Sequence, residues 1–240
     1  MIRHSANTGF LWPDLPFLQR IGAAAAAGFD AVEFHDEAQR ADPAALADAL
    51  AASGLPVIGL NAAMGASAGC AAIPGREAEA MRGAEEAIAL AERVGARAVH
   101  VLAGRTDAPD RAQYVRVLRH ACAGTDRTIL IEPICRAAMP DYALHDLPGA
   151  ARLVAEVGAP NLRILFDRFH VETQHGGAEA LVERHLPLVG HVQIASVPAR
   201  ADPDAPCLAF MAAARRAGYA GPFGCEWRAA GRPVPPEDPA

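Results

Sequence analysis

Apolar and polar positions follow two patterns that alternate along this chain. Short, mostly apolar runs are typical of buried strands. Longer segments with helical spacing separate them; one begins with the cap and first-turn pair Asp42 and Pro43, and another ends at Gly28. The pattern predicts strands over residues 2–7, 30–34, 55–60, 98–102, 128–132, 162–167, 190–194 and 221–226. It predicts helices over residues 15–28, 42–53, 76–94, 107–123, 146–157, 178–185 and 206–217.

This order of elements predicts the fold class. Eight strands that alternate with helices favour an α/β fold of the single (β/α)8 TIM barrel type over an open doubly wound sheet. The length of 240 residues suits one such domain over residues 1–240. No Gly-x-Gly-x-x-Gly follows the first strand, so a nucleotide-binding fold loses its usual support. Residues 228–240 are rich in Pro and charge and predict no eighth helix, so we expect a truncated closure or a frayed tail.

Four oxygen-bearing side chains lie at equivalent places in the second half of the chain. Glu132, Asp167, Gln193 and Glu226 each close, or nearly close, a predicted strand. In a parallel barrel the carboxyl ends of the strands meet at one mouth, so these side chains should meet as well. Three carboxylates crowded together repel one another unless a cation holds them. The pattern therefore predicts a hard divalent ion, Mg²⁺ or Mn²⁺ rather than zinc or copper.

Charge and composition exclude several classes of function. The net charge is −6 and the pI about 5.8, which argues against a nucleic-acid partner, because such proteins usually carry a basic face. No apolar stretch is long enough for a membrane span, and the first residues carry no apolar signal region. We therefore expect a cytoplasmic enzyme that acts on a small molecule. The sequence leaves the oligomeric state open, a homo-oligomer included.

The basic residues and the cysteines narrow the chemistry further. Every cationic residue is an arginine, and no lysine occurs. Schiff-base aldolases and pyridoxal-phosphate enzymes both need a lysine amine, so both are excluded. The five cysteines form no Cys-x-x-Cys pair, which argues against a disulfide framework or a structural zinc site.

Motifs along nearly the whole chain resemble those of the hydroxypyruvate isomerase family, within the xylose isomerase-like barrels. They include Ser-Ala-Asn at 5–7, Gly-Phe-Asp-Ala-Val-Glu-Phe at 28–34, Gly-Leu-Asn at 59–61 and Ile-Pro-Gly-Arg-Glu-Ala-Glu at 73–79. They continue with Val-His-Val-Leu-Ala-Gly-Arg at 99–105, Ile-Glu-Pro-Ile at 131–134 and Phe-Asp-Arg-Phe-His at 166–170. The last are Gly-His-Val-Gln-Ile-Ala-Ser-Val-Pro at 190–198, Gly-Tyr-Ala-Gly at 218–221 and Gly-Cys-Glu-Trp at 224–227.

The resemblance implies roles for the four strand-end residues. It implies that Glu132, Asp167, Gln193 and Glu226 ligate the metal, and that Glu132 and Glu226 form the catalytic acid/base pair. Related ketose 3-epimerases usually place a histidine at the third of these positions, whereas inosose dehydratases can share the glutamine.

The chain departs from the family pattern near the expected barrel mouth. Cys135 stands where the family usually has Asn, Arg168 and Phe169 replace Leu and Tyr, and Trp227 replaces a frequent Tyr. The glutamate that normally precedes the seventh helix is missing. These departures leave the substrate open.

Further side chains are expected around the mouth. His170 follows Asp167 by three residues, so we expect it in the loop above the sixth strand, where it contacts a substrate oxygen or makes a structural hydrogen bond. Arg105, just past the fourth strand, suits a substrate carboxylate, although a surface role is an equal alternative. The substrate-binding set that we predict consists of Asn7, Asn61, His100, Arg105 and His170.

A second group is expected to line or support the same region. Glu33 ends the second strand and either lines the site or anchors arginines. His191 shares a strand face with Gln193 and is either an orienting group beneath it or a core residue. Phe10 and Trp12 are expected to shape the mouth.

These observations favour a metal-dependent aldose–ketose-type isomerase of carbohydrate metabolism. The leading substrates are the pair hydroxypyruvate and tartronate semialdehyde, followed by a four-carbon 2-oxo acid. Proton transfer through an enediolate, with the metal polarising the carbonyl, is the expected reaction. The alternatives are a ketose 3-epimerase, an inosose-type dehydratase, and a barrel that binds a sugar acid or metal without turnover.

Overall fold

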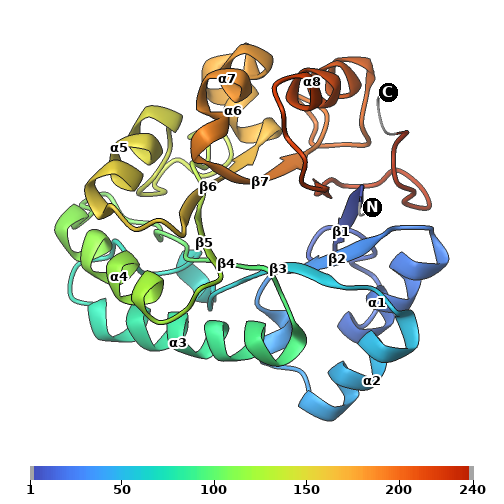
Figure 1. The fold of residues 1–240 in the computed structure, drawn as a ribbon, viewed down its shortest axis with the longest axis horizontal. Helices are drawn as coiled ribbons and strands as arrows, with labels where there is room; N and C mark the ends of the chain where they lie inside the picture. Colours follow the sequence, from blue (N-terminus) through green and yellow to red (C-terminus); the bar gives the residue numbers. More distant parts are fainter. Residues whose placement is uncertain (1–2, 238–240) are drawn as a thin grey trace.

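The computed structural model describes residues 3–237, which form a closed barrel of eight parallel strands (Figure 1). Each strand pairs with the next one along the chain, and β1 pairs with β8 to close the ring. The predicted (β/α)8 barrel is therefore confirmed. The strands are β1 (His4–Asn7), β2 (Ala31–Phe34), β3 (Val57–Asn61), β4 (Ala98–His100), β5 (Thr128–Ile131), β6 (Leu162–Asp167), β7 (Val189–Ile194) and β8 (Phe223–Cys225).

Helices surround this barrel on the outside (Figure 1). They are α1 (Phe17–Ala26), α2 (Pro43–Ser53), α3 (Glu77–Val94), α4 (Arg111–Ala123), α5 (Leu147–Val157), α6 (Arg168–His175), α7 (Ala178–His185) and α8 (Ala205–Arg216). Short 3₁₀ turns lie at η1 (Glu37–Gln39), η2 (Gly65–Ser67) and η3 (Leu186–Leu188). Aspartate caps fix several helix starts by accepting a backbone N–H of the first turn. These caps are Asp42, Asp110, Asp146 and Asp204.

The core lies between the barrel and its helices. Strand residues such as Phe166 are fully buried, and the Phe166 ring stacks on Phe210 of α8 at 5.8 Å. Alanine on the inner face of α3, at Ala84, Ala87 and Ala91, lets that helix approach the strands closely. No helix within residues 3–237 is long and apolar enough to cross a membrane.

One predicted loop is a helix instead. Helix α6 begins directly after β6, whereas the sequence pattern predicted a loop between residues 167 and 178. Asp167, the last residue of β6, caps this helix, because its Oδ1 accepts the N–H of Phe169 at 2.8 Å. The expectation that His170 lies in a loop is therefore wrong: it lies in the first turn of α6.

The described residues begin just before β1, and the segment that follows β8 contacts α1. The predicted first strand starts at His4, and residue 2 lies outside the described residues, as do residues 238–240. In the described part of the chain no helix follows β8, as the sequence predicted. The chain instead extends across the barrel end towards α1, where Arg232 Nη2 donates to the carbonyl oxygen of Ala26 at 3.0 Å.

Candidate active site

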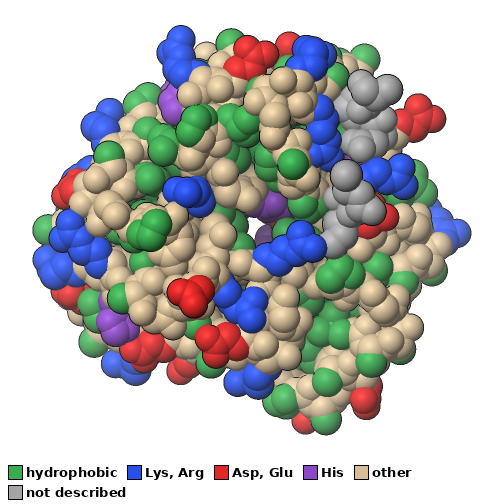
Figure 2. Space-filling model, in the orientation of Figure 1, with side chains coloured by type: hydrophobic (Ala, Val, Ile, Leu, Met, Phe, Trp, Pro, Cys, Tyr) green, Lys and Arg blue, Asp and Glu red, His purple; other side chains and the backbone are tan. Residues whose placement is uncertain are grey.

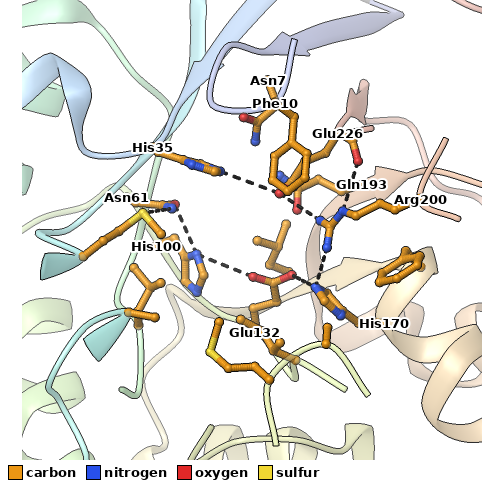
Figure 3. A pocket seen from close by; sticks show the side chains of 18 of the residues that line it. Asn7, Phe10, His35, Asn61, His100, Glu132, His170, Gln193, Arg200 and Glu226 are labelled. Carbon is orange, nitrogen blue, oxygen red and sulfur yellow. Dashed lines mark hydrogen bonds and ion pairs between the residues drawn. The ribbon is translucent and has the colours of Figure 1, made fainter. Parts of the chain in front are cut away.

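A cavity of about 460 Å³ lies at the carboxyl ends of the strands (Figure 3). Of the four predicted ligands, Glu132, Gln193 and Glu226 line it directly. Asp167 is 1% exposed and is not part of the described lining. It contacts Arg200 and His170, which line the cavity. Other side chains lining the cavity include Asn7, Phe10, His35, Asn61, His100, Met139, Phe169 and Arg228.

Strand pairing explains why these residues come together. Asp167 at the end of β6 is the register partner of Gln193 in β7. Glu226 follows β8 directly, and its backbone N–H donates to the carbonyl of Ile194 at 3.2 Å. Glu132 follows β5 in the same way. All four side chains are buried at one barrel end, where Glu132, Gln193 and Glu226 line the cavity and Arg200 joins Asp167 to Glu226.

Arg200 is the cation of this acidic site. Its Nη2 lies 2.7 Å from Asp167 Oδ2 and 2.9 Å from Glu226 Oε1, so one guanidinium bridges two carboxylates. Its Nη1 donates to His170 Nε2 at 2.9 Å. The rings of Phe10 and Phe169 lie 4.5 and 4.9 Å from its central carbon, a cation–π contact on each ring.

Sequence reasoning missed this arginine. Arg200 lies in the loop between β7 and α8, two residues beyond the quoted motif that ends at Pro198. A signal was available, because a chain without lysine must neutralise three carboxylates with arginine or with a metal. Its backbone has φ of 50°, a left-handed conformation that a sequence pattern does not reveal for arginine.

A fully buried cluster beneath the cavity holds Gln193. The Gln193 side chain donates through Nε2 to Glu33 Oε2 at 2.8 Å. Glu33 Oε1 accepts from Ser5 Oγ at 2.6 Å and lies 3.1 Å from His191 Nε2. Burial alone would raise the pKa of Glu33, but the nearby His191 and the hydrogen-bond donors outweigh it and lower that pKa. Gly224 makes room, because a Cβ there would clash with Glu33 Oε1.

The consequence is a fixed amide orientation. With Nε2 engaged by Glu33, Gln193 Oε1 is the free end of the side chain, and it is buried with no hydrogen-bond partner. A buried unpaired carbonyl oxygen is costly unless it serves a ligand. Glu33 therefore has an anchoring role, but it anchors Gln193 rather than arginines. His191 lies beneath Gln193 and contacts Glu33, which fits the orienting role.

Glu132 lies close to two other carboxylates, those of Glu226 and Asp167. Burial, followed by the charges of Glu226 and Asp167, raises its pKa well above the usual range. Two imidazoles flank it, with His170 Nε2 at 3.7 Å from Oε1 and His100 Nδ1 at 3.9 Å from Oε2.

Next to Glu132, the β3–β4 side of the cavity carries Asn61 and His100. His100 Nδ1 lies 3.2 Å from Asn61 Oδ1, and burial lowers the pKa of His100 to about 3. The imidazole is therefore neutral, and its Nε2 is buried without a partner. Asn7 also lines the cavity, with Oδ1 accepting the N–H of Gly9.

His35 is a second residue that the sequence reasoning did not name. It follows β2, and its Nε2 lies 3.6 Å from Glu226 Oε1. Burial would lower its pKa, but the contact with Glu226 outweighs this and raises it. His35 and Arg200 therefore both lie within 4 Å of the same oxygen of Glu226.

Not every expected residue reaches the cavity. Arg105 is absent from its described lining; its Nε donates to Asp141 Oδ1 at 2.9 Å, and its side chain is 47% exposed. The loop after β4 carries it to the surface, so the surface alternative describes its position. Trp12 is also absent from the lining, since its ring packs edge-on against Phe29. Cys135, at a position that departs from the family pattern, lies behind His170 with Sγ 3.3 Å from Nδ1.

The residues present fit a divalent cation. Ligand atoms of Glu132, Asp167 and His170 lie within 4.8 Å of one another. Gln193 and Glu226 line the same cavity (Figure 3), and Gln193 Oε1 is buried without a hydrogen-bond partner. An oxygen-rich set of this kind suits Mg²⁺ or Mn²⁺. His170 is a further nitrogen donor that the predicted set did not contain.

Known proteins that are similar to this chain belong to the family that the motifs indicated. Residues 21–240 match the family described as Xylose isomerase-like TIM barrel. A Putative hydroxypyruvate isomerase of Homo sapiens is 36% identical, with 97% of this chain and 92% of that protein covered. A 2-oxo-tetronate isomerase of Cupriavidus necator is 37% identical, with 95% and 93% covered. The resemblance inferred from the motifs is confirmed.

Solved structures show the same fold. A crystal structure named AP endonuclease, family 2, from Brucella melitensis has a TM-score of 0.90 at 32% identity and covers 96% of this chain and 95% of that chain. A D-allulose 3-epimerase from Methylomonas sp. has a TM-score of 0.78 at 19% identity, with 95% and 85% covered, which shows the shared fold alone.

Proposed function

The chain belongs to the xylose isomerase-like TIM barrel family, and from this premise we propose that it is a metal-dependent isomerase of small hydroxy-oxo acids. Hydroxypyruvate with tartronate semialdehyde is the leading pair, and a four-carbon 2-oxo acid is the next candidate. Full-length relatives carry isomerase names, which confirms the enzyme class predicted from the sequence. The observation that carries the proposal is the meeting of three buried carboxylates with the unpaired Gln193 Oε1 at one cavity.

Glu132, Asp167, Gln193 and Glu226 would hold the metal. A bound divalent ion would polarise the substrate carbonyl and make the neighbouring carbon-bound proton more acidic. The anchoring of Gln193 through Glu33 supports this ligand set, because ligand side chains fixed by a second partner keep their orientation.

We assign the proton transfers to Glu132 and Glu226. In this isomerisation one proton moves between two carbons and another between two oxygens, so we assign one group to each transfer. Arg200 and His35 both lie close to Glu226 Oε1. A nearby positive charge favours the ionised carboxylate, which is the form that a base needs. Glu132, whose pKa is raised by burial and by Glu226 and Asp167, is suited to handle the proton on oxygen.

Arg200 is the group that we assign to the substrate carboxylate, in place of Arg105. It is 9% exposed, so its charge acts in a water-poor cavity. Arg228 also lines the cavity but is exposed. A neutral ketose offers no carboxylate to a buried guanidinium, which is why we favour an acid substrate over the 3-epimerase alternative.

The test is a substrate screen with controlled metal. The chain is stripped of metal with a chelator and reloaded with Mg²⁺ or Mn²⁺. It is then incubated with hydroxypyruvate, 2-oxo-tetronate or D-fructose. We expect isomer formation from the oxo acids only after reloading. Epimerisation of the ketose without conversion of either acid would contradict the proposal.

The name of the Brucella melitensis structure raises a second candidate, cleavage of DNA at abasic sites. On the face shown in Figure 2, acidic and basic side chains are interspersed around the rim rather than gathered into a basic patch. With a net charge of −6 the chain lacks the usual attraction to phosphates. We expect no cleavage of an abasic duplex under the conditions that support isomerisation, and efficient cleavage would favour the second candidate.

A further inference from the structure

The segment after β8 stands where an eighth helix would cover the barrel, and it contacts the loop that carries Arg200. Arg228 N–H donates to the carbonyl of Arg200 at 2.8 Å. Arg200 Nε in turn lies 3.3 Å from the carbonyl oxygen of Glu226. Backbone contacts on both sides of Trp227 therefore join this segment to Arg200.

A side-chain pair completes the connection. Trp227 is fully buried, and its Nε1–H donates to Asp202 Oδ1 at 3.0 Å. The other oxygen of Asp202 accepts the N–H of Ala230 at 3.0 Å. One carboxylate in the β7–α8 loop is thus held by two groups of the C-terminal segment.

Arg200 needs this support for two reasons. Its backbone adopts a left-handed conformation that is unfavourable for residues with a Cβ. Its guanidinium must also stay between Asp167 and Glu226 while the side chain lines the cavity. Within the loop, Arg200 N–H donates to the carbonyl of Ser196 at 3.0 Å, which closes a tight turn. The turn alone does not fix the loop relative to the barrel.

We propose that Trp227 and Asp202 are positioning residues for Arg200. Through their hydrogen bond the C-terminal segment controls substrate binding. This proposal rests on the proposed function, in which Arg200 binds the substrate carboxylate. Trp227 touches no reacting atom; it acts through the loop.

The direct test replaces Trp227 with phenylalanine, which removes the N–H but keeps an aromatic ring in the buried space. We expect the KM for the oxo acid to rise about 3- to 10-fold, the range of one lost hydrogen bond, with kcat changed less than about 2-fold. Trp12→Phe is the matched control, because it is the same substitution at a tryptophan that lies outside the cavity lining, and it should leave KM unchanged.

Two further measurements separate positioning from a general structural role. In an Arg200→Gln background, Trp227→Phe should raise KM no further, since its effect passes through the arginine. Amide hydrogen exchange of residues 195–204 should be faster in Trp227→Phe and unchanged in Trp12→Phe. The proposal is overturned by a KM equal to wild type, by an equal KM rise in the Arg200→Gln background, or by a lowered melting temperature with unchanged loop exchange.

The exchange measurement also separates this proposal from the proposed function. If the wild-type protein converts none of the acids, the isomerase assignment fails. Loop exchange then still decides whether Trp227 fixes the Arg200 loop: faster exchange supports this and wild-type exchange excludes it.

Discussion

Two charged groups at this barrel end are held in contrasting ways. Glu33 lies beneath the cavity, and its three partners Ser5, His191 and Gln193 all come from strands of the barrel. Arg200 lies on the cavity wall, and it comes from a loop whose position depends on stacking, on the carboxylates it bridges and on the C-terminal segment.

The difference teaches how the site divides its tasks. Groups on strands are fixed by the same hydrogen bonds that close the barrel, so they suit metal ligation, which tolerates little displacement. A group on a loop can vary without disturbing the barrel, so it suits selection of the substrate. Changes beneath the cavity should therefore affect metal binding, and changes in the loop should affect substrate binding.

The largest effect should come from the base itself. Glu226→Gln leaves an amide oxygen for the metal but cannot accept a proton, so we expect turnover to fall about 10²- to 10⁴-fold with the fold retained. Steady-state kinetics with circular dichroism as the folding control measures this. Turnover near that of the wild type would refute Glu226 as the base.

Next in size is the loop arginine. Arg200→Gln should weaken binding of oxo acids by about 2–5 kcal/mol, because a buried charged partner is lost. Arg105→Ala, at the exposed arginine paired with Asp141, should leave KM within about 2-fold of wild type. If the two variants behave alike, the carboxylate is bound elsewhere and a neutral substrate becomes the better hypothesis.

A smaller effect should follow from changing the group beneath the cavity. Glu33→Gln frees the Gln193 amide to turn, so we expect Mn²⁺ affinity to fall about 10- to 100-fold. Calorimetric titration of the metal-free protein measures this. Glu79→Gln on the exposed side of α3 is the control. Unchanged affinity in Glu33→Gln would show that Gln193 needs no anchor or is no ligand.

The strand-borne part of the site was predictable from the sequence for a physical reason. Barrel closure forces the carboxyl ends of the strands together, so Glu132 and Glu226 could be placed in one cavity from their positions after apolar runs. The same reasoning located His100 and Asn61, which end or nearly end β4 and β3. The fold and the meeting of these residues at one cavity therefore followed from periodicity and family motifs.

The loop-borne part was not predictable in this way. Arg105 and Arg200 both follow a strand by a few residues, yet one lies on the surface and the other in the cavity. What separates them is long-range: Arg200 is drawn inward by two carboxylates and two aromatic rings, whereas Arg105 meets Asp141 outside. Helix α6 was missed because its cap, Asp167, was interpreted only as a metal ligand.

The central claim is that this site moves a carbon-bound proton with Glu132 and Glu226. The most direct measurement is isomerisation in D₂O by the Mn²⁺-loaded protein, with the product analysed by NMR and mass spectrometry. The account predicts deuterium at the newly formed C–H position, because a carboxylate proton exchanges with solvent between removal and delivery. A product that carries only protium at that carbon would show that no exchange with solvent takes place, and it would contradict the account.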